Sequence, residues 1–510
     1  MRALISVFDK TGLDDFARGL AELGFELVAS GGTAEHLEKL GLDVTRVEDV
    51  THAPEMLGGR VKTLHPGIHG GILARRDNAD DVAALADQQI QPFDLVCVNF
   101  YPFSDAVGAR GTREEDAVEM IDVGGPSMLR AAAKNFEHVA PVCRPVQYGG
   151  VLEELREHGS LSRETRRRLA TAAFASTAAY EAAIAAWFAG REDFPEIVTL
   201  SFHKVQDLAY GENPHQRGAY YAEQGARRHL LSQVEQLHGR QLSFTNLYDL
   251  GEAVMLLREF ALPTCVIVKH ANPCGVAIAG TIEAAYERAF ASDPLSAFGM
   301  VCVLNRPVSA ELGKSIATQF VDVLLAPGFD DEALEALKTK PAMRILVDHE
   351  RRAYGAGERD YKRVPGGLLI QDRDWDIEDR ESMQVVCGEP AEEQWGDLLF
   401  AWRVCKHVGS NAIVLAKGLQ TIGIGAGQQS RVDSVKIALG KARQFEHSLD
   451  GSVLASDAFF PFTDGPELAL ASGIAAIIQP GGSKRDDEVI AAVKAAKAAM
   501  VFTGRRHFRH

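Results

Sequence analysis

The chain has 510 residues, so a typical domain size of ~150 residues predicts about three folding units. Apolar residues make up 46% and charged residues 24%, as in globular proteins with ordinary buried cores, and the low aromatic content of 7% favours helices packed on sheets. The formal net charge of −16 opposes binding to a polyanion, so no nucleic-acid partner is expected.

None of the seven cysteines forms a C-x-x-C pair, which indicates buried, reduced thiols in a cytosolic protein. The first apolar run, Ala3–Phe8, is followed at once by Asp9 and Lys10, so it predicts a strand rather than a secretion signal. No stretch approaches the ~20 apolar residues that cross a bilayer. We therefore expect a cytoplasmic protein without a membrane partner.

The start of the chain alternates strands and helices. Ala3–Phe8 and Phe25–Ala29 are predicted strands. Apolar residues at helical spacing in Leu13–Leu23 predict a helix that Gly24 ends, and Ala34–Leu40 begins a second helix. This alternation predicts a parallel sheet covered by helices.

The pattern continues to a domain boundary near residues 191–195. Asp94–Asn99 is a predicted strand, residues 112–135 form a helical region, and residues 161–189 are an Ala-rich helix. The segment from Arg191 to Pro195 then interrupts the pattern, which places the boundary there within about ten residues.

Two loops of the first half carry residues suited to phosphate. Ser30–Thr33 follows a strand and opens a helix that Thr33 could cap, and its glycines let backbone N–H groups approach an anion, although a simple capped turn fits equally well. Residues 58–67 combine glycines with Arg60, Lys62 and His65. If this loop is extended, Arg60 and Lys62 point to one face, which favours a phosphorylated substrate over a solvated basic loop.

The second half has its most informative residues where a predicted strand ends. Residues 266–268 are apolar, and Lys269 and His270 follow, with Asn272 just after. A histidine can take a proton near neutral pH, and an adjacent lysine can stabilise an oxyanion, although a lone histidine at a strand end is more often structural. A second Lys-His pair, at 406–407, hints at an internal duplication.

Two other patterns are weak. His270, Asn272 and Cys274 are similar to a zinc deaminase signature, but Asn272 replaces its glutamate and Ala277 stands where a second cysteine is needed, so no zinc site is expected. The string GIGAG at 423–427 lacks dinucleotide-binding spacing, and a glycine-rich turn is the better interpretation.

Taken together, the motifs resemble one family from Ile5 to His510: the bifunctional purine biosynthesis protein, phosphoribosylaminoimidazolecarboxamide formyltransferase/inosinicase. The resemblance rests on these strings in order: DKTG, ASGGT, PEMLGGRVKTLHP, YPF, IDVGGPSMLRAAAKN, YGENPHQ, VKHANPCG, DPLSAFG, CKHVGSNAIVLA, GIGAGQQSR and SDAFFPF.

The resemblance implies an α/β fold with a methylglyoxal-synthase-like, parallel-sheet IMP cyclohydrolase domain at residues 1–193. A formyltransferase domain at 197–510 would comprise two cytidine-deaminase-like α/β subdomains, at about 197–375 and 376–510. It further implies 10-formyltetrahydrofolate as co-substrate, no catalytic metal, and a homodimer.

The resemblance also implies site residues. For the cyclohydrolase these are Lys62, Tyr101, Asp122 and Lys134, with Lys10, Ser30, Gly31, Gly32, Thr33, Arg60 and Thr63 holding its nucleotide. For the formyltransferase they are Lys269, His270 and Asn411, with Tyr210, Gly299, Asp322, Phe459 and Arg506 on the nucleotide and Val432, Pro461, Phe462 and Asp464 near the folate.

Two departures from the family pattern affect phosphate contacts: Ala209 replaces an arginine, and Phe8 replaces a small polar residue. Two rival functions remain open at this point. One is a phosphate-eliminating lyase resembling methylglyoxal synthase, and the other is a nucleotide-sensing module with decayed sites.

Overall fold

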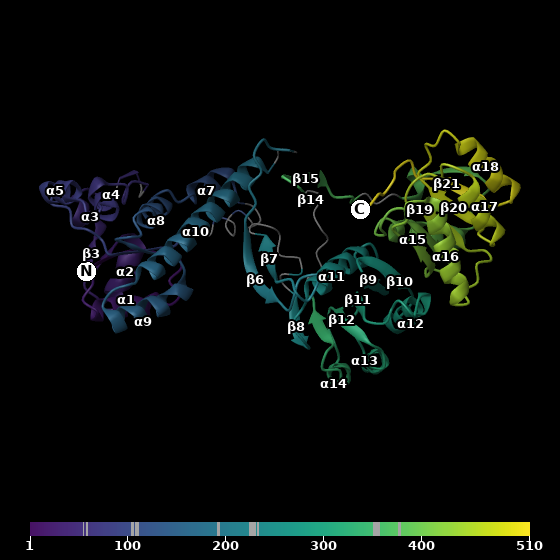
Figure 1. Ribbon diagram of the computed structural model, residues 1–510, viewed down its shortest axis with the longest axis horizontal. Helices are drawn as coiled ribbons and strands as arrows, with labels where there is room; N and C mark the ends of the chain where they lie inside the picture. The colour runs from purple at the N-terminus through teal and green to yellow at the C-terminus, as the bar shows by residue number, and fades with distance from the viewer. Residues whose placement is uncertain are drawn as a thin grey trace. The chain divides into compact units, whose positions relative to one another are not determined.

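The computed structural model describes residues 1–510 except 55, 58–59, 102, 104–106, 108–111, 191–193, 224–230, 232–233, 350–357 and 376–378. The chain divides into two compact units (Figure 1). Unit 1 is Met1–His203 with Ala222–Ala226, and unit 2 is Lys204–Tyr221 with Arg227–His510. A two-stranded sheet of β6 (Phe202–Leu208) and β7 (Gly218–Glu223) contains two of the three points of division.

Unit 1 is built on a five-stranded sheet in the order β3-β2-β1-β4-β5, and all its pairs are parallel. Its strands are β1 (Arg2–Ser6), β2 (Glu26–Ala29), β3 (Val44–Arg46), β4 (Leu95–Val98) and β5 (Ala140–Val142). Its helices are α1 (Leu13–Glu22), α2 (Gly31–Lys39), α3 (Val47–Thr51), α4 (Pro66–Leu73), α5 (Ala79–Asp87), α7 (Glu114–Glu119), α8 (Gly124–Lys134), η2 (Pro145–Gln147), α9 (Tyr148–His158) and α10 (Arg163–Ala189). The predicted parallel sheet is confirmed.

Helices cover both faces of this sheet because β1 is apolar on both sides. Ala3 and Ile5 belong to the core formed with α1, α2 and α9, whereas Leu4 belongs to the core formed with α4, α8 and α10. Such near-continuous apolar strands are typical of parallel sheets buried between two helical layers.

Helix α10 is long and apolar enough to cross a membrane by length and composition. The expectation that no such stretch exists is therefore wrong by this measure. In unit 1, however, α10 packs on α8 and β5, and Ala170 and Ala173 enter the core on that face. This packing makes α10 part of the helical layer on that face of the sheet.

The loop predicted at Ser30–Thr33 is instead the first turn of α2, which begins at Gly31. Ser30 occupies the N-cap position without a side-chain cap. Thr33 does not cap either, because its Oγ1 accepts from the Val7 N–H at 3.1 Å and donates to the Val7 carbonyl at 3.0 Å. These two bonds fasten the start of α2 to the end of β1.

Unit 2 contains two six-stranded mixed sheets with the same strand order, β10-β9-β11-β12-β13-β8 and β18-β17-β19-β20-β21-β16. In the first part of unit 2 the elements are β8 (Glu235–His238), α11 (Phe244–Leu257), β9 (Thr264–Lys269), β10 (Asn272–Ile278), α12 (Ile282–Ser292), β11 (Met300–Leu304), α13 (Ala310–Ala317), β12 (Val321–Ala326), α14 (Asp331–Lys338), β13 (Arg344–Val347), β14 (Arg359–Val364) and β15 (Gly367–Asp372). In the second part they are η4 (Arg380–Ser382), β16 (Gln384–Cys387), α15 (Glu392–Cys405), β17 (Ile413–Ala416), β18 (Thr421–Gly425), α16 (Arg431–Gln444), β19 (Val453–Ser456), α17 (Asp464–Ala471), β20 (Ala476–Gln479), α18 (Asp486–Ala495) and β21 (Ala499–Phe502). Both sheets have the same parallel and antiparallel pairs, so each sheet with its helices is one copy of a repeated subdomain.

The two subdomains meet at their edge strands β10 and β18. Ala277 and Gln420 form an antiparallel bridge, and the Ile278 N–H donates to the Leu419 carbonyl at 3.0 Å. One apolar core continues from α11 of the first subdomain to α15 of the second. The subdomains therefore share both a sheet edge and a core.

The duplication is real, but the sequence pairing that hinted at it was wrong. Lys269 and His270 lie at the end of strand β9, whereas Lys406 and His407 follow helix α15. The counterpart of the β9–β10 turn is the β17–β18 turn, residues 417–420. The second Lys-His pair is therefore a coincidence of sequence.

The glycines at 423 and 425 form neither a turn nor a nucleotide loop, because both lie in strand β18. A Cβ at Gly423 would overlap the Ala438 carbonyl of α16, and one at Gly425 would overlap the Ser434 carbonyl. In the other subdomain, a Cβ at Gly275 of β10 would overlap a carbonyl of α12 in the same way. These glycines let a helix lie directly on its strand.

Candidate functional site

One edge of the unit 1 sheet gathers predicted nucleotide-binding residues. Lys10 follows β1, Ser30 follows β2 and Tyr101 follows β4. The carboxyl ends of parallel strands share an edge, and the strand order reverses between β1 and β4. Such a switch point is where open α/β sheets bind ligands.

Asn99 organises this edge, although the motifs did not single it out. Its side-chain oxygen accepts the Phe8 N–H at 2.6 Å and the Asp9 N–H at 3.0 Å, while its Nδ2 donates to the Asp9 carbonyl at 2.8 Å. The loop after β1 is thus fixed to the loop after β4. Phe8 also packs edge-on against the Tyr101 ring, with centroids 5.1 Å apart.

Lys62 and Thr63 reach the same edge from the loop before α4. The Lys62 Nζ lies 3.0 Å from where a Cβ on Gly31 would stand, and the Thr63 Oγ1 lies 2.7 Å from the same position on Gly124. Gly31 also has φ +47°. Glycine is therefore favoured there both by this backbone conformation and by the closeness of the Lys62 Nζ. The structure therefore brings together the segment before α4, the start of α2 and the start of α8.

A carboxylate that the sequence did not single out faces Lys62. Glu48 Oε1 lies 3.7 Å from the Lys62 Nζ, and Glu48 Oε2 is buried without a hydrogen-bond partner among the described residues. Arg60 lies apart from this pair, because its guanidinium is held by the exposed Glu119. Arg60 and Lys62 thus have different acidic partners. Gly58 and Gly59 of this loop lie outside the described residues.

Asp122 lies between α7 and α8 and is the most perturbed of the predicted cyclohydrolase groups. Burial raises the pKa of the Asp122 carboxyl, against the lowering effect of the Gly125 and Gly124 amides. The Gly125 N–H donates to Asp122 Oδ1 at 2.9 Å. A carboxyl with a raised pKa can carry a proton closer to neutral pH.

Lys134 is not brought to Asp122 by unit 1. It is the exposed last residue of α8, whose first residue is Gly124. Ten residues of helix separate these ends by about 15 Å. Lys62 lies beside the first residue of α2, and Asp122 lies just before the first residue of α8. Lys134 lies at the opposite end of α8.

In unit 2, Lys269 and His270 lie at the turn between β9 and β10. The two central residues, His270 and Ala271, have φ values of 54° and 60°. Two-residue turns of this kind prefer Asn and Gly, because a left-handed residue with a Cβ costs about 1–2 kcal/mol. His270 is exposed, so its imidazole is available to a ligand.

Lys269 is anchored beside two further predicted residues. Its Nζ donates to the Phe298 carbonyl at 2.5 Å, next to Gly299, which has φ +73°. Asp322 lies on β12, whose partner strand β11 begins directly after Gly299. Lys269, His270, Gly299 and Asp322 therefore meet at one end of the sheet.

The Phe298 and Phe320 rings stack at this end, with centroids 4.7 Å apart, and both are more than half exposed at 64% and 51%. The Tyr210 carbonyl accepts the N–H of Phe244 at the start of α11. Arg506 is exposed near the chain end, and its guanidinium lies over the Phe508 ring. Among the described residues, no hydrogen bond or ion pair joins Tyr210 or Arg506 to His270.

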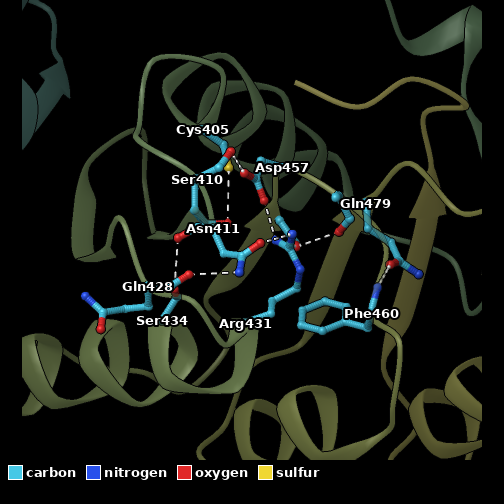
Figure 2. A network of polar contacts seen from close by, with 12 residues as sticks. Cys405, Ser410, Asn411, Gln428, Arg431, Ser434, Asp457, Phe460 and Gln479 are labelled. Carbon is cyan, nitrogen blue, oxygen red and sulfur yellow. Dashed lines mark hydrogen bonds and ion pairs between the residues drawn. The ribbon is translucent and has the colours of Figure 1, made fainter. Parts of the chain in front are cut away.

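Asn411 is the centre of a polar network in the second subdomain (Figure 2). Its Nδ2 donates to the carbonyls of Gln428 and Gln429, at 2.8 and 3.1 Å, and its Oδ1 accepts from Arg431 Nη2 at 2.7 Å. Arg431 also pairs with the fully buried Asp457. The Asn411 amide is thus held in one orientation, and Arg431 and Asp457 are supporting residues that sequence reasoning missed.

The residues expected near the folate lie beside this network. Val432 follows Arg431 in the first turn of α16. Phe459 to Thr463 lie in the loop from β19 to α17, and Asp464 is the first residue of α17. Phe459 and Phe462 are partly exposed, and Phe460 is buried with its N–H on Gln479 Oε1 at 2.8 Å. The hydrogen bond from Phe460 to Gln479 anchors this loop. Two partly exposed aromatic rings on an anchored loop suit a flat heterocycle.

The two clusters of unit 2 are joined through Asn272. Its Nδ2 donates to the His270 carbonyl at 3.1 Å, and its Oδ1 accepts the Gly409 N–H at 2.9 Å. Asn411 follows Gly409 by two residues. Asn272 therefore links the Lys269–His270 turn to the segment that leads into Asn411.

Across the described residues, no group of three or more His, Cys, Asp or Glu side chains could hold a metal ion. All seven cysteines are free thiols, five of them buried.

Comparisons with known proteins agree with this architecture. The chain matches the family model "AICARFT/IMPCHase bienzyme" over residues 132–441 and the model "MGS-like domain" over residues 12–127. The second match confirms the methylglyoxal-synthase-like fold expected for the first domain. A solved structure titled "Crystal structure of ForH" is 42% identical and covers 37% of this chain and 98% of its own, with a TM-score of 0.33.

Three curated relatives carry the name "Bifunctional purine biosynthesis protein PurH". Those from Magnetococcus marinus, Persephonella marina and Acidithiobacillus ferrooxidans are 50%, 48% and 47% identical to this chain. Each alignment covers 100% of this chain and 99% of the relative. The chain therefore belongs to the family of AICARFT/IMPCHase bienzymes.

Proposed function

We propose that this chain carries out two consecutive steps of purine biosynthesis. The first transfers a formyl group from 10-formyltetrahydrofolate to 5-aminoimidazole-4-carboxamide ribonucleotide, and the second closes the formylated product to IMP with loss of water. The full-length match to the PurH relatives supports this function and does not favour a triose-phosphate lyase or a decayed sensor.

The observation that carries the first step is the exposed His270 on the β9–β10 turn, with Lys269 and Asp322 beside it. In the proposed reaction, His270 accepts a proton as the substrate amine attacks the formyl carbon, and the bond to the folate nitrogen then breaks. Lys269 and Asn411 stabilise the tetrahedral intermediate and position the reactants. We assign this step to residues 197–510.

The second step is assigned to residues 1–193, at the edge formed by the loops after β1, β2 and β4. There the carboxamide nitrogen attacks the formyl carbon, and a water molecule leaves. Lys62, Tyr101 and Asp122 orient the substrate and move protons, and the raised pKa of Asp122 supports a role in proton transfer. Lys134 is kept in this set on the family resemblance alone.

The same resemblance leads us to propose a cytoplasmic homodimer that binds neither nucleic acid nor membrane. Leu369 on β15 and Tyr361 on β14 are exposed apolar side chains on a two-stranded sheet. Phe202 and Val205 are exposed on β6. Light scattering after size exclusion measures the assembly, and a monomer at micromolar concentration would contradict the dimer.

Substitution of His270 tests the function directly. His270→Ala is expected to lower formyl transfer by about 10²–10⁴, the usual effect of removing a positioned acid or base, while cyclisation of supplied formylated nucleotide stays unchanged. The reciprocal variant Asp122→Asn is expected to lose cyclisation and keep formyl transfer. Spectroscopic detection of tetrahydrofolate release measures the first step, and formation of IMP measures the second. Loss of both activities in a folded His270→Ala variant would contradict separate sites.

A further inference from the structure

The turn that displays His270 is unfavourable by its own sequence. His270 and Ala271 both have positive φ, and neither is Asn or Gly. Each left-handed residue with a Cβ lowers the population of such a turn about tenfold relative to glycine. An interaction from outside the turn is therefore needed to hold the backbone in this conformation.

Asp249 provides that interaction. Its Oδ1 accepts the Ala271 N–H at 2.8 Å, and its Oδ2 accepts the His270 N–H at 3.2 Å. Asp249 lies inside α11, beyond the Ser243 cap, so it does not cap its own helix. Both carboxylate oxygens face the backbone amides, and hydrogen bonds to an ionised acceptor are about twice as strong as neutral ones.

The second subdomain repeats this arrangement. Asp397 of α15 accepts the N–H groups of Gly418 and Leu419, at 2.7 and 2.6 Å, in the turn between β17 and β18. Gly418 and Leu419 also have positive φ, 60° and 61°. An aspartate on the helix before the hairpin is thus the device by which this fold holds the turn, and in the first subdomain the turn carries an imidazole.

The lysine before each turn is repeated as well. The Lys417 Nζ donates to the Asp450 carbonyl at 2.6 Å, just as the Lys269 Nζ donates to the Phe298 carbonyl. Gly418 stands where His270 stands in the first subdomain. The second turn therefore has the same backbone support without the imidazole.

We propose that Asp249 is a positioning residue for formyl transfer, which holds the Lys269–His270 turn so that the imidazole faces the reacting groups. This inference rests on the proposed function. Burial raises the pKa of Asp249, against the hydrogen bonds from Ala271 and His270. Burying a carboxyl has a free-energy cost, and the two amide bonds offset it.

The central test is Asp249→Ala. We expect kcat for formyl transfer to fall about 10–10²-fold, the size of effect that ~1 Å of misplacement produces. The KM for the nucleotide should change less than kcat, because Asp249 itself faces the backbone. Cyclisation of supplied formylated nucleotide should be unaffected.

The chain offers a matched control and a rescue. Asp397→Ala removes the same support from the turn without an imidazole, so it should lower Tm but leave kcat for formyl transfer near that of the wild type. Ala271→Gly removes one conformational penalty, so the double variant Asp249→Ala/Ala271→Gly should recover part of the lost kcat, about fivefold or more. A purely structural role for Asp249 predicts no such recovery of kcat.

Three results would overturn the inference: an unchanged kcat in Asp249→Ala, an equal loss of kcat in Asp397→Ala, or no recovery in the double variant. If Asp249→Ala does not fold, Asp249→Asn decides, because it keeps one acceptor and should show a smaller loss of kcat that Ala271→Gly again reduces. A wild-type chain without formyl transfer would overturn the proposed function instead, so the two failures are distinguishable.

Discussion

Glu259 is a buried carboxylate whose loss should weaken unit 2. It follows α11 and lies 2.9 Å from both the Lys406 Nζ and the His407 Nε2. The side chains of Glu259, Lys406 and His407 are only 10%, 6% and 9% exposed. Burial alone would raise the pKa of Glu259, but His407 and Lys406 lower it to about 2.

Glu259→Gln keeps the shape of this side chain and removes its charge. Breaking one partner of a buried ion pair costs about 3–5 kcal/mol, because the remaining charge loses its compensation. At about 2.1 cal/mol/K of unfolding entropy per residue, the ~300 residues of unit 2 convert this loss into a fall in Tm of about 5–8 °C. Tryptophan fluorescence can follow the transition, since Trp395 and Trp402 lie on α15.

The matched control is Glu335→Gln on α14. Glu335 pairs with Lys338 at 3.1 Å, but its side chain is 75% exposed, so the expected loss is at most about 0.5 kcal/mol. A second variant, Glu259→Gln/Lys406→Met, removes both charges and should recover most of the lost stability. If Glu259→Gln costs no more than Glu335→Gln, or if the double variant is weaker than the single one, the argument from the buried pair is refuted.

Two further stability predictions follow from unit 2. Burial, with the Arg509 and Lys406 charges, lowers the pKa of His407 below its usual value despite Glu259, and its Nδ1 accepts from Arg509 Nη1 at 3.2 Å. As the pH falls, His407 therefore takes up a proton in the unfolded chain before it does so in the folded chain. Protonation favours unfolding, so the Tm of unit 2 should fall as the pH drops through about 6.5. His407→Gln, measured over the same pH series, should show a smaller fall; an identical pH dependence would contradict the assignment. Gly425→Ala should lower stability by about 1–3 kcal/mol through overlap with the Ser434 carbonyl, whereas Gly440→Ala in the open middle of α16 should raise it by about 0.5–1 kcal/mol. Equal effects of the two glycine variants on Tm would show that the close approach of β18 and α16 is not maintained in solution.

The parallel sheet of unit 1 could be predicted because its signals are local. An apolar run such as Ala3–Phe8 and the helical spacing in Leu13–Leu23 each lie within one element. The start of α2 could not be predicted from the same information. Gly31 reads as a loop residue, and only the bonds between Thr33 and Val7 show how that helix begins.

The supports of the candidate site were hidden because they come from distant parts of the chain. Asn411 is oriented by Arg431, which in turn is held by Asp457. Neither side chain is distinctive in sequence, and their contact with Asn411 exists only after β17, α16 and β19 have packed together. The family strings contain Arg431 and Asp457 as well as Asn411, but nothing in the strings shows that these three side chains meet.

Asp249 did leave a signal that could have been found. It precedes the first turn residue, His270, by the same 21 positions that separate Asp397 from Gly418. Recognising that spacing requires the correct alignment of the two subdomains. The two Lys-His pairs instead suggested an alignment that joins a strand end to a helix end.

The repeated hairpin has a consequence for stoichiometry. Although the fold presents the same turn twice, only one copy ends in an imidazole, and its counterpart at Gly418 has no side chain at all. If His270 accepts the proton in the proposed formyl transfer, each chain therefore carries one turn that can do so rather than two. The turn without an imidazole instead contacts the first subdomain, because Leu419 and Gln420 bond to Ile278 and Ala277 of β10.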